Sequence, residues 1–273
     1  MRYLKFLAVL LAVMLLCGCG PKGPSVDISA TTGPVAQFTL AVTEGTGLTV
    51  TQVVTDSVSC LHDYSLSVGQ LEAIASSRVT VVSGGGLEDT MEDALNTAYM
   101  RIDCSKGTAY DDPHFWLDPA ESARMVDVIC DQLSTVYPVY APLFRLNADK
   151  YKEKLDALQA YGQEQLAELS CRELVTFHDG FGCMAKAFDL EIAAAIEEEA
   201  GAEASAQSLI DIIGLIEDRE IPAVFTEKNG SDAAASLIAA ETGVSIYALD
   251  MALSGDYLDA MYHNINTLKE ALS

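Results

Sequence analysis

The chain has 273 residues, of which half are apolar, and it carries 40 acidic against 16 basic side chains, for a formal net charge of −24. A surface this acidic repels nucleic acid and anionic lipid and attracts cations, so we exclude nucleic acid as a partner. The length is enough to fill one large or two small hydrophobic cores.

Residues 1–18 have the composition of a secretory signal peptide. A basic start precedes an apolar run of about 11 residues, which is too short to cross a bilayer. The sequence LCGC at 16–19 resembles a bacterial lipobox, in which Cys19 is acylated and becomes the new N-terminus. Ordinary secretion with cleavage near Gly20 is the alternative. We expect residues 19–35 to form a tether and the lipid to be the only membrane anchor, on the extracytoplasmic side.

The first half of the chain alternates predicted strands and helices. Apolar, β-branched runs predict strands at 38–42, 48–54 and 79–82. A short helix is expected between the last two, and an amphipathic helix after the glycines at 84–86. No basic residue follows these glycines, so we interpret them as a tight strand-to-helix turn rather than as a phosphate-binding loop.

A long helix is predicted to divide the chain into two lobes. The helix that precedes this long helix is expected to begin after Asp118, which caps it. Pro119 then lies in the first turn, and Glu121 completes a capping box. The charged segment 147–169 then predicts a rod that joins an N-terminal α/β lobe at 36–146 to a C-terminal α/β lobe at 170–273.

The second half repeats the alternation more clearly. Strands are predicted at 172–177, 222–226 and 244–249, with helices at 205–219 and 231–243 between them. A further amphipathic helix ends the chain. Strands that alternate with helices indicate a parallel sheet with helices on both faces. We therefore expect an α/β fold of two lobes.

Potential metal ligands follow the predicted strands of the second half. His178 ends the first strand, Glu227 the second and Asp250 the third. The carboxyl ends of parallel strands meet at one edge of a sheet, where ligands bind in open α/β folds. We expect these three side chains to share that edge.

Two more histidines precede helices in the first half. His62 lies in SCLHDYSL, and His114 lies in DPHFWLDP between Pro113 and an aromatic pair expected to pack behind it. His263, far from the apolar stripe of its helix, is expected to face solvent. Three imidazoles and Asp250 form a four-ligand set suited to a divalent transition metal in a cleft between the lobes.

Several motifs occur in the order found in one family of proteins. The chain resembles the metal-binding lipoproteins of bacterial zinc and manganese ABC importers from about residue 48 onward, with DPHFWLDP as the most specific element. The motifs are HDY at 62–64, GGGLEDTMEDAL at 84–95, DPHFWLDP at 112–119, FHDGFG at 177–182 and ALD at 248–250.

The resemblance implies a fold, a ligand set and partners. Such proteins have two α/β lobes joined by one long helix, with the ion between the lobes, and the family's ligands fall on His62, His114, His178 and Asp250. It further implies a monomer that receives a divalent ion and passes it to an ABC permease and its ATPase. A histidine at the third ligand position goes with zinc in this family, while Mn²⁺ or Fe²⁺ is the alternative, and imidazole itself suits zinc.

The sequence allows more than one role for the other acidic residues and for the cysteines. Glu227 is a candidate for supporting the ligands, and Asp63 and Asp179 could each orient the histidine beside it or be solvated loop acids. Cys60 could add a thiolate ligand, be a buried thiol or pair with Cys104. Cys171 and Cys183 could form a disulfide in a secreted protein.

Two features depart from the family's pattern. The TEGTG segment at 43–47 leaves no room for the helix that usually separates the first two strands, so we expect a trimmed first lobe. The histidine-rich acidic loop common in zinc binders is missing.

Two other classes of function remain open. A surface-anchored zinc metallohydrolase would need an open coordination position, which three histidines and one aspartate do not leave, and Glu227 is its only credible base. An adhesin would need an exposed apolar patch, which the sequence alone does not reveal.

Overall fold

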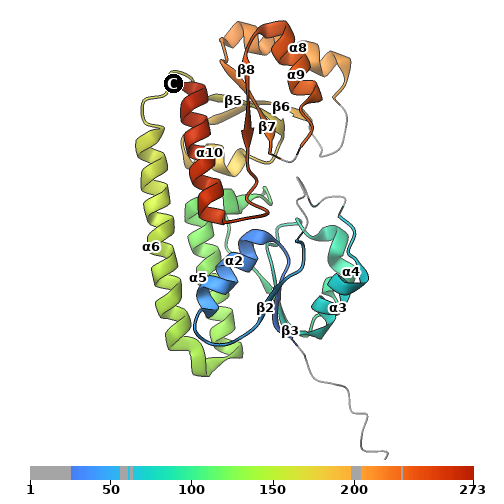
Figure 1. The fold of residues 1–273 in the computed structure, drawn as a ribbon, viewed down its shortest axis with the longest axis vertical. Helices are drawn as coiled ribbons and strands as arrows, with labels where there is room; N and C mark the ends of the chain where they lie inside the picture. Colours follow the sequence, from blue (N-terminus) through green and yellow to red (C-terminus); the bar gives the residue numbers. More distant parts are fainter. Residues whose placement is uncertain (1–25, 56–60, 62–63, 198–203, 229) are drawn as a thin grey trace, which may run out of the picture.

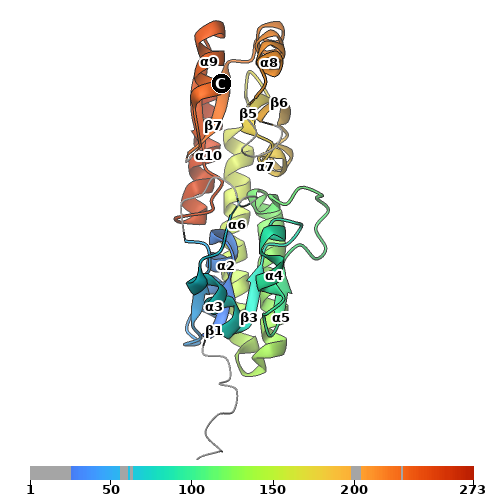
Figure 2. The same ribbon diagram turned by 90° about the vertical axis from the view of Figure 1, so that its right-hand side faces the viewer.

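The computed structural model describes residues 26–55, 61, 64–197, 204–228 and 230–273. The predicted signal peptide, Cys19, Cys60, His62 and Asp63 lie outside the described residues. Two α/β lobes stand end to end along the long axis of the molecule, with the helices α5, α6 and α10 running beside them (Figures 1 and 2). The predicted fold class is confirmed.

The N-terminal lobe is built on a parallel sheet in the order β2-β1-β3-β4. Its strands are β1 (Val26–Ala30), β2 (Val50–Gln52), β3 (Ser77–Val82) and β4 (Arg101–Asp103). Its helices are α2 (Gly33–Thr43), α3 (Val68–Ser76), α4 (Glu92–Leu95) and α5 (Pro119–Val136), with single 3₁₀ turns at Asp89–Met91, Phe115–Leu117 and Pro138–Tyr140.

The first strand and helix differ from the prediction. Residues 26–30, assigned to the tether, form β1, and the segment 38–42, predicted as a strand, lies inside α2. A helix therefore does separate the first two strands, and the expectation of a trimmed lobe was wrong. Most of α2 is buried, so its sequence is apolar on nearly every side and lacks the polar face that reveals a helix.

The joining helix α6 (Ala141–Gln165) begins earlier than predicted and packs against α2, α5 and α10. Asp118 caps α5 as expected, since its carboxylate accepts the N–H of Ala120 at 2.8 Å. Glu121 does not complete a capping box; it pairs with Arg124 instead.

The C-terminal lobe is built on a second parallel sheet, in the order β6-β5-β7-β8. Its strands are β5 (Glu173–His178), β6 (Glu191–Glu197), β7 (Ala223–Glu227) and β8 (Ser245–Leu249), and its helices are α7 (Gly182–Ala187), α8 (Ala206–Arg219), α9 (Ala233–Thr242) and α10 (Tyr257–Leu272). The predicted strands and helices are all present, and β6 and α7 are additional.

Helix α10 belongs to both lobes. It begins at the level of α2 and runs up beside α6 to the C-terminus, near the upper sheet (Figure 1). Tyr257 at its start is fully buried and packs edge to face on Phe38 of α2, with ring centroids 5.0 Å apart. One continuous apolar core therefore runs from the first lobe into the second, while α8 and α9 cover a separate core on the C-terminal sheet.

The glycine turn after β3 behaves as a packing element. Gly84, Gly85 and Gly86 all have positive φ. The buried carboxylate of Glu88 accepts the backbone N–H groups of Ser83 and Gly84 at 2.8 and 2.9 Å and the hydroxyl of Thr31 at 2.6 Å. A phosphate bound at this turn would need these N–H groups as donors, but they already donate to Glu88.

The described cysteines form no disulfide with one another. Cys104, Cys130, Cys171 and Cys183 are free, so the Cys171–Cys183 alternative is wrong, and the alternatives for Cys60 fall on a residue outside the described ones. Within the described part of the chain, no helix combines the length and apolar character needed to cross a bilayer.

Candidate metal centre

His114 is held by the segment before helix α5. The carboxylate of Asp112 accepts the backbone N–H of His114 at 2.8 Å, and the same oxygen lies 2.8 Å from the ring Nδ1. Burial alone would raise the pKa of Asp112, but the hydrogen bonds from His114 lower that pKa below its usual value. A carboxylate on Nδ1 fixes the orientation and tautomer of the ring, as it does for histidines that bind a metal ion through Nε2.

Both aromatic residues after His114 are buried, and Trp116 packs against His114 as predicted. Phe115 and Trp116 are fully buried, and the Trp116 ring lies edge-on to His114 with centroids 5.4 Å apart. The indole Nε1 donates to the carbonyl of Met251 at 2.8 Å. The segment that holds His114 is therefore attached directly to the loop after β8.

His178 faces His114 from the other lobe. It ends β5, is only 5% exposed, and its ring centroid lies 5.4 Å from that of His114. Its Nδ1 contacts the carboxylate of Glu227, which ends the neighbouring strand β7. Its Nε2 is buried and has no hydrogen-bond partner among the described residues. A buried imidazole nitrogen without a partner is unfavourable unless something else binds it.

Asp250 lies at the carboxyl end of β8, next to β7 in the sheet. It is 6% exposed. Its Oδ1 accepts the N–H of Ala252 at 2.8 Å, and its Oδ2 accepts Lys228 Nζ at 2.9 Å. Asn264 of α10 holds the backbone of Asp250 on both sides, through its Oδ1 and Nδ2 at 2.7 Å. The predicted edge of the C-terminal sheet therefore carries His178, Glu227 and Asp250.

The structure does not assemble a complete ligand set from the described residues. Among these residues, which exclude His62 and Asp63, no group of three or more His, Cys, Asp or Glu side chains lies close enough together to hold a metal ion. What it does bring together is the pair His114 and His178, each with a carboxylate at Nδ1. Two rings supported in this way are typical of transition-metal ligands.

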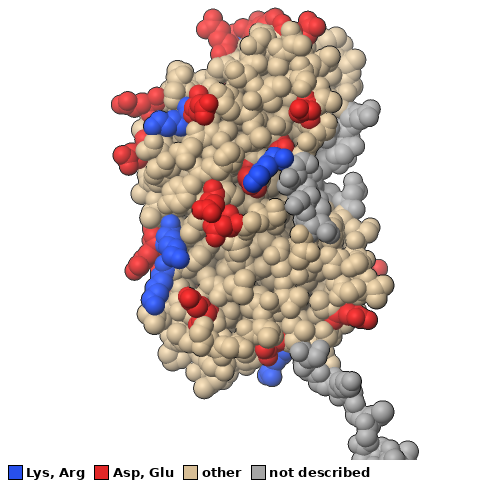
Figure 3. Space-filling view, in the orientation of Figure 1, with Lys and Arg blue, Asp and Glu red and all other residues tan. Residues whose placement is uncertain are grey.

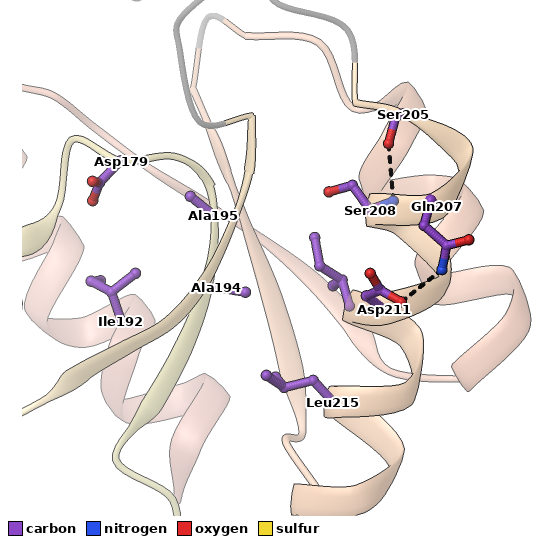
Figure 4. Close-up of a pocket in the computed structure, with 10 residues that line it drawn as sticks. Asp179, Ile192, Ala194, Ala195, Ser205, Gln207, Ser208, Asp211 and Leu215 are labelled. Carbon is purple, nitrogen blue, oxygen red and sulfur yellow. Dashed lines mark hydrogen bonds between the residues drawn. The ribbon is translucent and has the colours of Figure 1, made fainter.

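Two predicted positions behave differently from the pair. Asp179 is exposed and lines a cavity of about 840 Å³ between β6 and α8 (Figure 4). Because the Nδ1 of His178 contacts Glu227, Glu227 rather than Asp179 supports this ring. His263 is exposed, as predicted, and its Nε2 lies 3.3 Å from the carbonyl of Ala248.

Sequence reasoning missed Asp112 and Lys228. Asp112 had a signal, because a carboxylate two residues before a histidine can reach back to its ring. Lys228 had none, since nothing in the sequence places it opposite Asp250.

The surface agrees with the acidic composition. On the face shown in Figure 3, acidic side chains are scattered over both lobes, and the few basic ones lie beside acidic ones. Such a distribution attracts cations from solution, but on this face it does not identify a single binding patch.

Comparison with known proteins identifies the family. The sequence profile of the family described as "Zinc-uptake complex component A periplasmic" matches residues 28–271. The chain belongs to this family. Members of the zinc-uptake component A family are solute-binding proteins for metal uptake and not enzymes, so the metallohydrolase alternative is set aside.

Relatives within the zinc-uptake component A family differ in their metal. The chain is 28% identical over 308 residues to the manganese-binding lipoprotein MntA of Bacillus subtilis, with full coverage of both proteins. It is 31% identical over 168 residues to the zinc-binding lipoprotein AdcA of Streptococcus pneumoniae, a match that covers 58% of this chain and 34% of AdcA. The crystal structure of ZnuA superposes with a TM-score of 0.80 at 25% identity, covering 91% of this chain and 99% of ZnuA.

Proposed function

We propose that this chain captures a divalent transition metal outside the cytoplasm, with Zn²⁺ as the preferred ion, and delivers it to an ABC permease and its ATPase. The proposed ligands are His62, His114, His178 and Asp250. The observation that carries the proposal is the pair of buried imidazoles from two lobes, 5.4 Å apart between centroids, with His178 Nε2 unpartnered among the described residues.

The ligand chemistry favours zinc over manganese. Imidazole nitrogen binds Zn²⁺ and other late transition metals well, whereas Mn²⁺ prefers oxygen ligands. The carboxylates of Glu227 and Asp112 contact the Nδ1 atoms of His178 and His114. In this proposal they orient the imidazole rings and do not themselves coordinate the ion. Because the manganese-binding MntA is similar over its whole length, Mn²⁺ is the competing cargo and must be measured beside zinc.

A lipid anchor fits this function. Acylation of Cys19 would hold the protein beside its permease, and two of the relatives are named as lipoproteins. Mass spectrometry of the membrane fraction should show a diacylated N-terminal Cys19, and Cys19→Ala should release the protein from membranes. A membrane-bound C19A variant would contradict the anchor.

Calorimetry on the full chain in detergent tests the metal site. We expect one Zn²⁺ per chain, weaker binding of Mn²⁺, and a loss of zinc affinity of at least about tenfold in His178→Ala, since one of four ligands is removed. His263→Ala is the matched control, because it removes an exposed histidine of the same lobe. Unchanged zinc affinity in H178A would overturn the assignment of the site. Tighter binding of Mn²⁺ than of Zn²⁺ would overturn the assignment of zinc as the preferred ion.

Transport itself requires a cellular test. Deletion of the chain should lower zinc accumulation at limiting zinc, and the wild-type chain but not H178A should restore it. Accumulation that is independent of the chain would contradict delivery to a permease.

A further inference from the structure

The end of strand β7 carries two consecutive residues that contact two proposed ligands. Glu227 contacts the Nδ1 of His178, and Lys228 donates to Oδ2 of Asp250 at 2.9 Å. The Asp250 carboxylate is 8% exposed and the Lys228 side chain is 61% exposed. A largely exposed lysine side chain is thus bound to a buried carboxylate of the candidate metal centre.

Both oxygens of Asp250 already have a donor. Ala252 N–H holds Oδ1, and Lys228 Nζ holds Oδ2. A backbone N–H cannot leave without moving the loop, whereas a lysine side chain can rotate away. Of the two donors, Lys228 is therefore the one that can give way to a metal ion at Asp250.

The ammonium and the metal ion cannot share Oδ2 favourably. Zinc binds a carboxylate oxygen at about 2.0–2.2 Å. With Lys228 Nζ at 2.9 Å from the same oxygen, the two cations would lie at most about 5 Å apart. Repulsion between a divalent and a monovalent cation at this distance opposes their simultaneous binding. Binding of the ion at Oδ2 should therefore be favoured when the lysine rotates away.

Lys228 is not needed to orient the carboxylate. Ala252 N–H fixes Oδ1, and Asn264 binds both the backbone N–H and the carbonyl of Asp250. These three contacts define the position of Asp250 without the lysine. Removal of Lys228 should therefore release a competitor and leave the ligand in place.

We propose that Lys228 sets the affinity of the metal centre by competing with the ion for Oδ2 of Asp250, which lowers affinity and speeds release to the permease. The proposal rests on the proposed function, in which Asp250 is a metal ligand. In this arrangement β7 tunes the site in two directions, because Glu227 strengthens His178 as a donor while Lys228 weakens the contribution of Asp250.

The test compares Lys228→Gln with wild type on the full chain in detergent, with Zn²⁺ titrated against a competing chelator. Removal of the competing charge should tighten zinc binding by about tenfold, equivalent to about 1.4 kcal/mol, and slow dissociation in stopped flow by a similar factor. Lys228→Arg keeps the cation and should stay within about threefold of wild type.

Lys269→Gln is the matched control. It makes the same change of charge on exposed Lys269, whose Nζ binds Gln165 Oε1 at the far end of α6. Its zinc affinity should equal that of wild type. An equal gain in K269Q and K228Q would show a general charge effect and overturn the proposal.

Asp250→Asn separates the possible failures. No zinc binding by wild type refutes the proposed function, and unchanged binding in D250N removes Asp250 as a ligand and the lysine proposal with it. If wild type binds and D250N is weakened, then unchanged or weaker binding in K228Q refutes the role of Lys228 alone.

Discussion

Substitution of Gly180 by alanine probes the position of the His178 ring. Gly180 lies in the turn between β5 and α7, where its N–H donates to the carbonyl of His178 at 2.9 Å. A Cβ atom at this position would lie 2.5 Å from both Cε1 and Nε2 of the His178 ring and 3.0 Å from Cε of Met251. The added methyl group would contact Nε2, the nitrogen that we propose binds the metal ion.

The size of the effect follows from these distances. Non-bonded heavy atoms pack at about 3.5–4.0 Å, so the ring must move by about 1 Å to accept the methyl group. A binding constellation tolerates displacements of about 0.5 Å, and metal–ligand distances vary by about 0.2 Å. His178 therefore cannot keep its coordination, and we expect zinc affinity to fall by about 10- to 100-fold. The cost to folding should stay within about 1–3 kcal/mol, as for other overpacked sites.

Calorimetry with Zn²⁺, together with thermal unfolding by circular dichroism, measures both quantities. Gly214→Ala is the matched control, because Gly214 lies in α8 and its added Cβ would meet no atom within 4 Å. That variant should keep its zinc affinity and gain about 0.5–1 kcal/mol in stability. A folded G180A protein with wild-type affinity would show that the Nε2 side of His178 does not face the ion, and the site assignment would fail.

Three further substitutions test the support of the site and the fold. Trp116→Phe removes the donor to the Met251 carbonyl, which should lower the free energy of unfolding in urea by about 1–3 kcal/mol. Because the loop that carries Asp250 would be held less firmly, zinc binding should weaken, and an unchanged zinc affinity would contradict this coupling. Gly162→Ala places a Cβ 2.2 Å from the Phe188 ring and should lower stability by about 1–3 kcal/mol without changing affinity for the metal. Glu88→Gln should destabilise by about 1–3 kcal/mol, since an amide cannot accept all three donors that bind Glu88. Burial raises the pKa of Glu88 above its ordinary value of 4.5, so the advantage of wild type over E88Q should be largest below pH 4.5 and shrink as pH rises through the raised pKa; a gap that widens toward neutral pH would refute this sign.

The edge of the C-terminal sheet could be predicted because it depends on short-range sequence patterns. Runs of β-branched and aromatic residues define β5, β7 and β8, and parallel strands bring their carboxyl ends together whatever the details of packing. His178, Glu227 and Asp250 follow directly from that rule. The rigid environment of His114 was also visible, since Pro113 and the capped helix after Asp118 are local features.

Other elements could not be predicted because their environment outweighs their local pattern. Strand β6 has the sequence EIAAAIE, whose alanines favour a helix, yet it is a strand because it pairs with β5 at the edge of the sheet. Helix α2 is buried on nearly all sides and so lacks a polar face. The Lys228–Asp250 pair joins residues 22 positions apart, and it exists only because β7 and β8 are neighbours in the sheet.

The contacts between the lobes bear on how an ion could leave. Trp116 binds the Met251 carbonyl, and Tyr257 N–H donates to Gln37 Oε1 of α2 at 2.8 Å. Gly33 lies so close to Leu253 that a Cβ there would be 2.2 Å from its carbonyl oxygen. The loop that carries Asp250 is therefore fixed to the same lobe as His114, and a wide separation of the lobes would break buried hydrogen bonds and divide a continuous core. These costs favour release through local rearrangement at the ligands. An ammonium group that takes back Oδ2 of Asp250 as the ion departs is a rearrangement of this kind, and it requires no movement of the lobes.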